Sequence, residues 1–406
     1  MQCTAPTSSV SIPPDAPVVV SPTSLAAAFA AVPDPRRRHG LHYALSAILA
    51  MTVAAILANQ LSVLAIAEWG ARQSADVRRA LGFPDGRTPC QSTIQRLFVK
   101  LDGRALAATL GAHFAPAAAP RPGGRGRQGV SIDGKAQRGC LPYAPGGCPV
   151  HALTAFCHDH GVVLAHEPIR HGADKAAGEL TVAPALVAQI DWRGRVLTGD
   201  ALFCQRRLCQ QVLAAGGDYL VLVKENQPAL YRDIRLLFDP PADSAPLPLL
   251  DRREARTVEK GHGREAEVRH LSASTDLTAY LDWPGLGQVF RLERTWREHG
   301  QRKQARHYGI TSLPPEDAAA DRLLALKRGH WRIENLLHRH KDVALGEDRC
   351  LIHCGQGPTI MALLREAALG LLHRRGVRRI AACLRHHSQH PEAAVALLTA
   401  PAASDA

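Results

Sequence analysis

The stretch GVSIDG, Gly129–Gly134, decides the class of fold that the sequence predicts. It is a short apolar run between glycines, which is the pattern of a buried β-strand. The stretch RVLTGD, Arg195–Asp200, has the same form, and in both runs an aspartate precedes a small residue. In sheets that alternate with helices, side chains at the carboxyl ends of strands face a crevice where chemistry takes place. Asp133 and Asp200 are therefore candidate functional residues.

The segments around these two strands complete the expected sheet. In chain order they predict a hairpin of Ala152–Cys157 and Gly161–Ile169, a helix over Ala176–Ile190, a helix over about Arg206–Ala215 and a strand over Asp218–Lys224. A hairpin followed by alternating helices and strands predicts an α/β fold, a mixed sheet with helices on both faces. Two further hairpins around Gly turns (GHG and EHG) predict a β-rich insertion at about 245–312.

The first third of the chain has a different pattern. Residues 1–23 are rich in Ser, Pro and Ala and predict a disordered lead. Residues 24–118 have helical periodicity throughout and predict an all-helical domain. A basic linker rich in Gly and Pro, residues 119–128, separates this domain from the sheet.

One segment of the helical domain could bind DNA. Thr88–Leu101 predicts a helix with Ser92 as its N-cap. Its apolar residues are spaced for one face and are Ile94, Leu97, Phe98 and Leu101. Gln95, Arg96 and Lys100 lie off that face, so the helix suits either the major groove of DNA or solvent.

The charge balance favours a polyanionic partner. Lys and Arg number 49 against 37 Asp and Glu, a net charge of +12, which suits nucleic acid or an anionic membrane surface. Tyr43–Ala67 contains no charged residue and follows the basic run Arg36–His39, as a membrane anchor would. Its polar residues Asn59, Gln60 and Ser62 favour buried helices instead. We therefore expect a cytoplasmic protein that is not associated with a membrane.

The 10 cysteines are scattered and form no CxxC pair, which predicts free thiols in a reducing compartment. Cys350, His353 and Cys354 are spaced like part of a zinc site. A second ligand pair is missing from the sequence around them, so structural zinc is not expected.

A third acidic residue stands in a basic stretch near the C-terminus. HWRIENLLH, His330–His338, lies in a helix predicted from about Asp317 to Leu345, in which residues three, four and seven apart are neighbours. The neighbours of Glu334 are Lys327, His330, Trp331, His338 and Lys341. This mostly cationic strip predicts a surface that faces a phosphate backbone. An exposed helix glutamate in contact with two histidines has the same pattern.

Three carboxylates on separate segments predict a metal site. Each aspartate taken alone could instead begin a turn or cap a helix. Together, Asp133, Asp200 and Glu334 would repel one another unless a divalent cation neutralised them. Oxygen ligands without a Cys or His partner indicate Mg²⁺ or Mn²⁺. Two such ions about 3.5–4 Å apart would clamp the attacking and leaving oxygens of a phosphoryl transfer.

Several motifs resemble the DDE transposases of bacterial insertion sequences, in the H-repeat-associated branch that has an N-terminal transposase-associated domain. The catalytic part resembles the family in SIDGKAQRG (Ser131–Gly139), TGDALFCQ (Thr198–Gln205), VKENQ (Val223–Gln227), RGHWRIENLLH (Arg328–His338) and GEDR (Gly346–Arg349). The N-terminal part resembles the associated domain in DPRRRHG (Asp34–Gly40) and STIQRL (Ser92–Leu97). The resemblance extends from about residue 24 to 375, and the motifs agree in type, order and spacing.

The resemblance implies a ribonuclease H-like catalytic domain over 129–375. The basic residues beyond it, within 376–406, predict a C-terminal helix and a tail. Asp133, Asp200 and Glu334 would be the catalytic residues of the ribonuclease H-like domain and would bind two Mg²⁺ or Mn²⁺ ions. The implied function is a DNA transposase that binds the terminal inverted repeats of an insertion sequence and catalyses strand cleavage and strand transfer. A ribonuclease H-like DNA nuclease, or a domesticated or inactive DNA-binding descendant, is the alternative.

The implied partner is double-stranded DNA, both terminal repeats and target, bound by a homodimer or a higher synaptic complex. The resemblance likewise implies a bacterial protein associated with the nucleoid. Related transposases have Tyr, Arg and Lys at fixed sequence spacings from the glutamate. Here Lys327 stands at the Tyr position, His330 at the Arg position and Lys341 at the Lys position. The residues expected to contact DNA are Lys135, Gln205, Lys224, His330, His338, Lys341, Arg96, Arg36 and Arg37.

Overall fold

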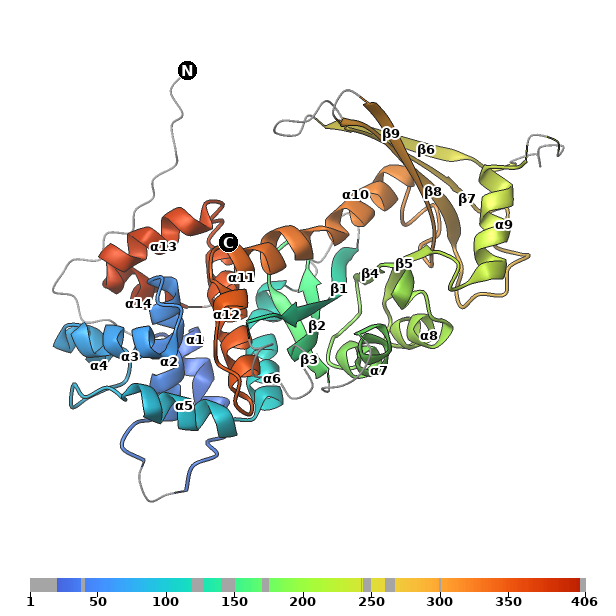
Figure 1. Cartoon of the computed structure of the whole chain (residues 1–406). Helices are drawn as coiled ribbons and strands as arrows, with labels where there is room; N and C mark the ends of the chain where they lie inside the picture. Colours follow the sequence, from blue (N-terminus) through green and yellow to red (C-terminus); the bar gives the residue numbers. More distant parts are fainter. Residues whose placement is uncertain are drawn as a thin grey trace.

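The computed structural model describes residues 20–37, 41–118, 127–139, 150–169, 175–241, 243, 250–259, 267–298 and 301–401. The described strands form one nine-stranded sheet in the spatial order β3-β2-β1-β4-β5-β9-β8-β7-β6. Helices lie against both faces of this sheet (Figure 1). The predicted mixed α/β class is therefore confirmed.

The first five strands follow the predicted order. β1 (Gln128–Gln137), β2 (Val150–Cys157) and β3 (Val163–Ile169) are antiparallel neighbours. β4 (Arg195–Gly199) lies parallel to β1 on its other side, and β5 (Asp218–Val223) lies parallel to β4. Every described residue of β4 and β5 is buried, which is typical of parallel strands covered on both faces.

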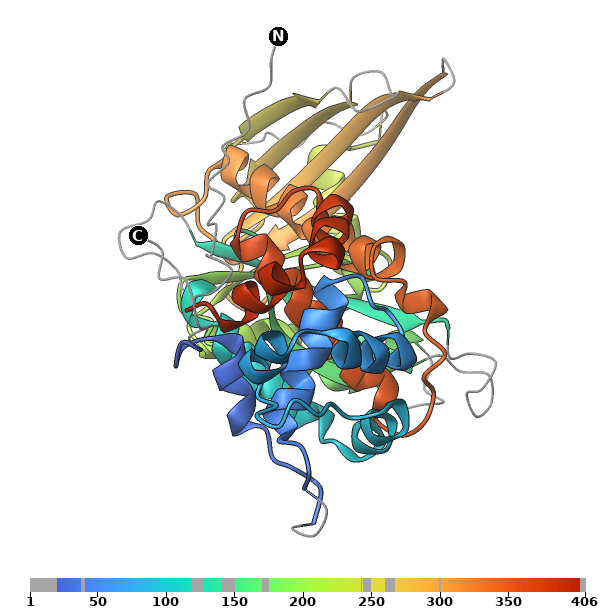
Figure 2. The ribbon, with the colours of Figure 1, turned by 90° about the vertical axis from the view of Figure 1, so that its left-hand side faces the viewer.

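The β-rich segment extends the same sheet. Its four strands are antiparallel neighbours and are β6 (Arg253–Glu259), β7 (Glu267–Ser274), β8 (Gln288–Glu298) and β9 (Gln301–Thr311). β9 pairs antiparallel with β5, so the two halves of the sheet are continuous. The outer strands rise away from the helical part of the molecule (Figure 2). Residues 260–266 and 299–300, which hold most of the two predicted turns, lie outside the described residues.

The helices against the sheet lie on opposite faces. α7 (Lys175–Val187) and α8 (Arg206–Ala214) cover one face, and α10 (Ala320–His330) crosses the other (Figure 1). α10 packs against β1, β4, β5, β6 and β7 through an apolar side that includes Leu323, Leu324 and Leu326. α9 (Pro228–Phe238) was not expected from the sequence and packs against β8 and β9.

The N-terminal segment contains six α-helices among its described residues. Its helices are α1 (Leu25–Ala28), α2 (Leu45–Leu57), α3 (Val63–Arg72), α4 (Ala75–Ala80), α5 (Gln91–Lys100) and α6 (Gly103–Phe114). Every residue of α2 except Ser46 is buried, because α1, α3, α12 and α14 all pack against it. The uncharged stretch that could have been a membrane anchor therefore contains a core helix. Among the described helices, none has the length and apolarity needed to cross a membrane.

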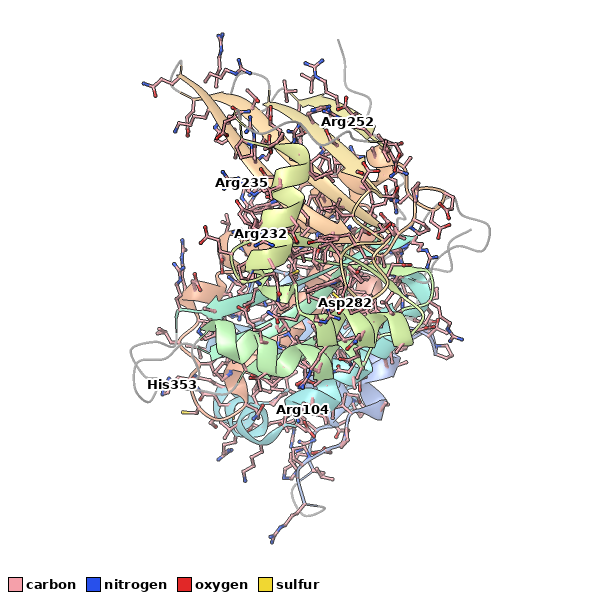
Figure 3. All side chains as sticks on the ribbon, turned by 90° about the vertical axis from the view of Figure 1, so that its right-hand side faces the viewer. Arg104, Arg232, Arg235, Arg252, Asp282 and His353 are labelled. Carbon is pink, nitrogen blue, oxygen red and sulfur yellow. The ribbon has the colours of Figure 1, made fainter. Side chains whose placement is uncertain are left out.

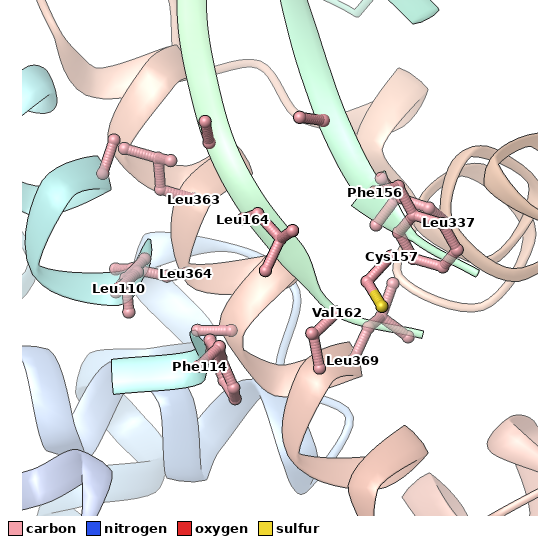
Figure 4. Packing of buried hydrophobic residues seen from close by; sticks show 14 of the residues in the cluster. Leu110, Phe114, Phe156, Cys157, Val162, Leu164, Leu337, Leu363, Leu364 and Leu369 are labelled. Atoms are coloured by element: carbon pink, nitrogen blue, oxygen red, sulfur yellow. The ribbon is translucent and has the colours of Figure 1, made fainter. Parts of the chain in front are cut away.

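The two ends of the chain share one core. α12 (Gly357–Arg374) packs against α2, α5 and α6, and α14 (Pro391–Thr399) packs against α1, α2 and α4. α13 (Ile380–Gln389) lies beside them (Figures 1 and 2). Figure 4 shows how Leu110 and Phe114 of α6 meet Leu164 of β3 and the leucines of α12. The predicted linker lies mostly in residues 119–126, outside the described part of the chain.

The predicted N-cap of the candidate recognition helix is wrong. α5 begins at Gln91, so Cys90 occupies the N-cap position and Ser92 lies in the first turn. The Ser92 hydroxyl contacts the Cys90 sulfur over 3.3 Å instead of capping the backbone. The apolar face is as predicted, since Ile94, Leu97 and Phe98 are buried while Arg96 is exposed.

Candidate active site

The two aspartates stand at equivalent positions on neighbouring parallel strands. The register pairs Ser131 of β1 with Thr198 of β4, and Asp133 and Asp200 each follow two residues later. Side chains two residues apart on a strand point to the same face. Asp133 and Asp200 therefore belong to the face of the sheet on which Ser131 and Thr198 lie.

One detail of the prediction for Asp133 needs correction. β1 continues to Gln137, and Asp133 pairs with Thr154 of β2 inside the strand. Only the parallel pairing with β4 ends before Asp133. Asp133 therefore marks the point where β1 and β4 separate, whereas Asp200 directly follows β4 as predicted. The separation opens the sheet beside both carboxylates.

The third acidic residue lies on a helical segment with altered geometry. The predicted continuous helix is interrupted: α10 ends at His330, a π-helical segment spans Ile333–His338, and α11 covers Arg339–Val343. A π turn is wider than an α turn and is frequent at functional sites. The interruption changes which residues share a face, and this part of the chain packs against β1.

The predicted exposed cationic strip around Glu334 is therefore wrong. Lys327, His330 and Lys341 are all buried, and so is His338. Trp331 and Glu334 remain exposed. The helix turns its cationic residues toward the interior because the sheet and α12 provide partners for them there.

Asp133, Glu334 and His338 come together. Nδ1 of His338 lies 3.1 Å from Oε2 of Glu334 and 3.5 Å from Oδ2 of Asp133. One ligand atom from each residue lies within 4.8 Å of the others, so among the described residues this group could hold a metal ion. The Asp133 and Glu334 side chains are 37% and 51% exposed, and that of His338 is 5% exposed. The site is thus open on its acidic side and closed behind the imidazole.

Asp200 lies outside that group of three and has its own surroundings. Its Oδ1 accepts a hydrogen bond from the Leu202 amide over 2.9 Å, which is the helix-capping contact that the sequence left open as an alternative. Its carboxylate is close enough to buried Lys327 to raise the pKa of that lysine, although burial outweighs this effect and lowers the pKa to about 8. Lys224, which directly follows β5, is exposed.

The VKENQ motif holds the loop that follows Asp200. The Asn226 side-chain amide donates to the Ala201 carbonyl over 2.7 Å, and that of Gln227 donates to the Cys204 carbonyl over 3.0 Å. Gln205 donates within the same loop, to the Leu202 carbonyl over 3.1 Å. The side-chain amides of this motif hold the backbone that directly follows Asp200 and so fix the position of Asp200.

A buried polar network lies behind the site. The Ser131 hydroxyl donates to the His330 carbonyl over 3.0 Å and lies 2.7 Å from Nε2 of His158. Because its single proton goes to that carbonyl, the hydroxyl accepts from His158. Thr198 lies 3.1 Å from the same Nε2 and 3.3 Å from Nδ1 of His330. Burial lowers the pKa of His158 to about 3, and it lowers the pKa of His330 well below its ordinary value.

Two glycines make room for His158. A Cβ at Gly129 of β1 would lie 2.1 Å from Nδ1 of His158, and one at Gly329 of α10 would lie 2.3 Å from it. Both distances are far below van der Waals contact, so the imidazole fits only between two residues without side chains. The glycine in the RGHW motif thus lets the helix approach the sheet closely.

The lysine beyond Glu334 lies in a buried charge network. Nζ of Lys341 lies 2.7 Å from Glu366 and 3.2 Å from Glu347, and Nδ1 of His166 lies 3.1 Å from Glu366. All four side chains are almost fully buried. Burial would raise the pKa of Glu366, but Lys341 and His166 hold it at about 2. Lys341 therefore joins α11 to α12 and to the GEDR motif in this conformation.

The remaining residues expected to contact DNA lie in varied settings. Lys135 is half-buried, and its Nζ lies 2.6 Å from Asp342. Arg36 binds Asp34 over 2.6 Å and donates to the Tyr43 carbonyl over 2.8 Å. Arg37 and Arg96 are exposed.

The sequence interpretation missed how His158, His166 and Glu366 act around the site. The sequence shows only that His158 directly follows the predicted strand Ala152–Cys157. Its position between Gly129 and Gly329 is visible only in the structure. His338 was expected to contact DNA, but the structure places its ring between two carboxylates.

Comparisons with known proteins agree with the motifs. Residues 124–371 match the family model described as the transposase DDE domain, and residues 26–114 match the one described as DDE_Tnp_1-associated. An uncharacterized protein from the dhlA 3′ region of Xanthobacter autotrophicus is 33% identical over 289 residues, 70% of this chain and 92% of that protein. YbfL of Escherichia coli K12 is 26% identical over 354 residues, 84% of this chain and 88% of that protein.

A further relative carries a functional name. YhhI of Escherichia coli K12, named as a candidate H repeat-associated transposase, is 28% identical over 256 residues, 60% of this chain and 63% of that protein. The transposase model alone matches more than half of the chain. The chain therefore belongs to the DDE transposase family, with relatives in its H-repeat-associated branch.

Proposed function

We propose that this protein is a DNA transposase that binds the terminal inverted repeats of an insertion sequence and catalyses strand cleavage and strand transfer. Asp133, Asp200 and Glu334 are its proposed catalytic residues. The observation that carries this proposal is that Asp133 and Asp200 each lie two residues after the last pair of β1 and β4, Ser131 and Thr198, together with the approach of Glu334 to Asp133 within 4.8 Å.

The strand order supports the ribonuclease H-like fold that the motifs imply. Three antiparallel strands, β3, β2 and β1, are followed by β4 and β5, which lie parallel to β1. The carboxyl ends of parallel strands in such a sheet form the usual place for a catalytic site. Asp133 lies just beyond the point where the pairing of β1 with β4 ends, Asp200 directly follows β4, and the helical segment that carries Glu334 packs onto β1.

The donor groups present suit a divalent cation. Asp133 and Glu334 approach one another on an open side of the site, and two carboxylates this close are stabilised by positive charge. Their oxygen atoms are ligands that Mg²⁺ and Mn²⁺ prefer. Asp133, Asp200 and Glu334 would hold the ions, which in phosphoryl transfer neutralise charge on the attacking and leaving oxygens.

The protein's own residues would position the DNA strand. Buried Lys327 is close enough to Asp200 and to exposed Lys224 to interact with both charges, and positive charge at this place favours a phosphate. The amides of Asn226 and Gln227 hold the loop after Asp200 in place. The distance between the sheet and the helix that leads to Glu334 is set by hydrogen bonds of Ser131, His158 and Thr198. Rigid placement of this kind supplies much of the rate in phosphoryl transfer.

The wider surface carries groups that suit DNA. The net charge is +12, and Figure 3 shows Arg232 and Arg235 projecting from α9, with Arg252 near the start of β6. Arg96 is exposed on α5, the proposed recognition helix. We propose that α5 contacts the terminal repeats, that the basic surface binds phosphates, and that two or more copies form the synaptic complex.

Cleavage of cognate DNA tests the proposal. The full chain is incubated with a duplex that carries the inverted repeats flanking its own gene, and strand breaks are mapped on sequencing gels. We expect cleavage at the repeat ends with Mg²⁺ or Mn²⁺, and none with Ca²⁺ or a chelator, because the looser coordination of Ca²⁺ does not hold the reacting oxygens in line. A duplex with scrambled ends is the control. Cleavage that is independent of the ends and of divalent metal would contradict the proposal.

A further inference from the structure

We propose that His338 is a metal ligand, and that its nitrogen makes the site bind Mn²⁺ more tightly than Mg²⁺. The inference rests on the proposed function, because it assumes that the carboxylates of Asp133 and Glu334 hold a divalent ion. It goes beyond the three acidic residues, since it assigns the imidazole of His338 to the same ion.

The geometry around the imidazole points to coordination. Nδ1 of His338 lies 3.1 Å from a Glu334 oxygen and 3.5 Å from an Asp133 oxygen. Neighbouring ligands of an octahedral ion with bonds of about 2.1 Å are about 3.0 Å apart. The two distances from Nδ1 are close to this value, and the ligand atoms of all three residues lie within 4.8 Å of one another, so an ion could enter if the two exposed carboxylates move toward it.

The ring is held in this orientation. His338 ends the π-helical segment, four residues after Glu334, and its side chain is only 5% exposed. Within the described part of the chain, its Nε2 is buried without a hydrogen-bond partner. The polar contacts of the ring are therefore made by Nδ1, on the side where the carboxylates lie. A ring fixed in this way is preorganised for an ion and turned away from solvent and DNA.

The nitrogen has a chemical consequence. Mg²⁺ is a hard cation that keeps oxygen ligands and gives up its waters reluctantly. First-row transition ions accept imidazole more readily, and a site with one nitrogen and two carboxylates shifts toward them. We therefore expect the site to bind Mn²⁺ more tightly than Mg²⁺. The alternative is that His338 only donates a hydrogen bond to the carboxylates and leaves the ion to oxygen ligands.

Electron paramagnetic resonance separates these two roles. Mn²⁺ is titrated into the full-length protein, free Mn²⁺ is quantified from its signal, and electron spin-echo modulation reports any ¹⁴N nucleus bonded to the ion. The variants are His338→Gln, Glu334→Gln and His340→Gln; His340 is a half-buried histidine of α11 that packs against His373 and provides a matched control. Circular dichroism confirms that each variant is folded.

The expected result is histidine ¹⁴N modulation in the wild type and in His340→Gln, and its loss in His338→Gln. That variant should also bind Mn²⁺ at least about tenfold more weakly, since even residues that only support a ligand change metal affinity by about 10–100-fold. Mg²⁺ should displace Mn²⁺ from the wild type only in large excess, and more easily from His338→Gln. Mn²⁺ binding that Glu334→Gln abolishes, but that shows no ¹⁴N modulation, would overturn this inference alone. Absence of Mn²⁺ binding in the wild type would overturn the proposed function as well.

Discussion

The hydroxyl of Ser131 donates a hydrogen bond to the backbone carbonyl of His330 over 3.0 Å. This contact ties the strand that carries Asp133 to the helix that leads to Glu334, although Ser131 and His330 are 199 positions apart in the chain. The same hydroxyl accepts from His158, whose ring lies between Gly129 and Gly329. The distance between the two acidic residues therefore depends on a buried network that holds no acid itself.

The close fit of Gly329 against His158 should make Gly329→Ala destabilising. An added Cβ would lie 2.3 Å from Nδ1 of His158, and overpacking of a fixed core group costs about 1–3 kcal/mol. The free energy of unfolding is measured by urea denaturation for Gly329→Ala, His158→Ala and the double variant. The double variant should lose less stability than the sum of the two single losses, because the clash disappears with the ring. Additive losses would show that the two residues do not meet.

The buried histidines should make stability depend on pH. The pKa of His158 is lowered to about 3, so between pH 6.5 and 3 the unfolded chain binds a proton that the folded chain does not. The contribution of neutral His158 is complete above its unfolded pKa and is lost as the pH falls, at about 1.4 kcal/mol per pH unit.

Urea denaturation at several pH values between 7.5 and 5 checks this prediction. Other buried histidines add to the total slope, so the informative quantity is the difference between the wild type and His158→Gln. The variant should have a slope that is smaller by about one proton below pH 6.5. Equal slopes would mean that His158 takes up its proton in the folded state.

Much of this arrangement could be predicted from the sequence. The strands that carry Asp133 and Asp200 are short apolar runs between turn residues, and such runs specify buried strands by local pattern. The joint presence of the two aspartates with Glu334 predicted an acidic site, and the structure brings Asp133 and Glu334 together. α2 was correctly favoured as a buried helix, because it combines high apolarity with neighbouring polar residues.

The errors arose where long-range packing decides the local structure. Helical spacing placed His330 and Lys341 on an exposed strip with Glu334. The π-helical segment changes which residues share a face of the helix, so this spacing no longer applies. Lys341 turns inward because Glu366 lies there, and Glu366 in turn contacts His166, 200 residues away. No local pattern reports partners at such separations.

The buried position of Lys341 predicts a structural role for it. Lys341→Met would leave Glu347 and Glu366 buried without their shared cation, and breaking such a pair costs about 3–5 kcal/mol. Lys303→Met is the matched control, because Lys303 pairs with Glu298 on the surface, where the cost is below about 1 kcal/mol. Urea denaturation compares the two variants. Equal, small losses of stability would contradict a buried ion pair and would return Lys341 to the DNA-facing role first expected from the sequence.

DNA binding should depend steeply on salt and should include Arg96 of α5. Each phosphate contact contributes about 0.9 to the slope of log affinity against log salt concentration. Arg96→Gln should lower that slope by about this amount for repeat DNA, as fluorescence anisotropy between 50 and 200 mM salt would measure. Arg193→Gln, an exposed arginine in the turn before β4, should leave the slope unchanged. If the two variants behaved alike, α5 would not face the phosphates.

The most direct measurement compares cleavage of cognate ends by single variants of the three acidic residues. Asp133→Asn, Asp200→Asn and Glu334→Gln each keep the shape of the side chain and remove one charge. If the three act as a unit, each should lower the cleavage rate on the order of a thousandfold or more, and the double variant of Asp133 and Glu334 should cost little beyond either single change. DNA binding should persist. Asp321→Asn, an exposed acid in the first turn of α10, should cleave at the wild-type rate. Cleavage by Glu334→Gln at the rate of Asp321→Asn would contradict the account.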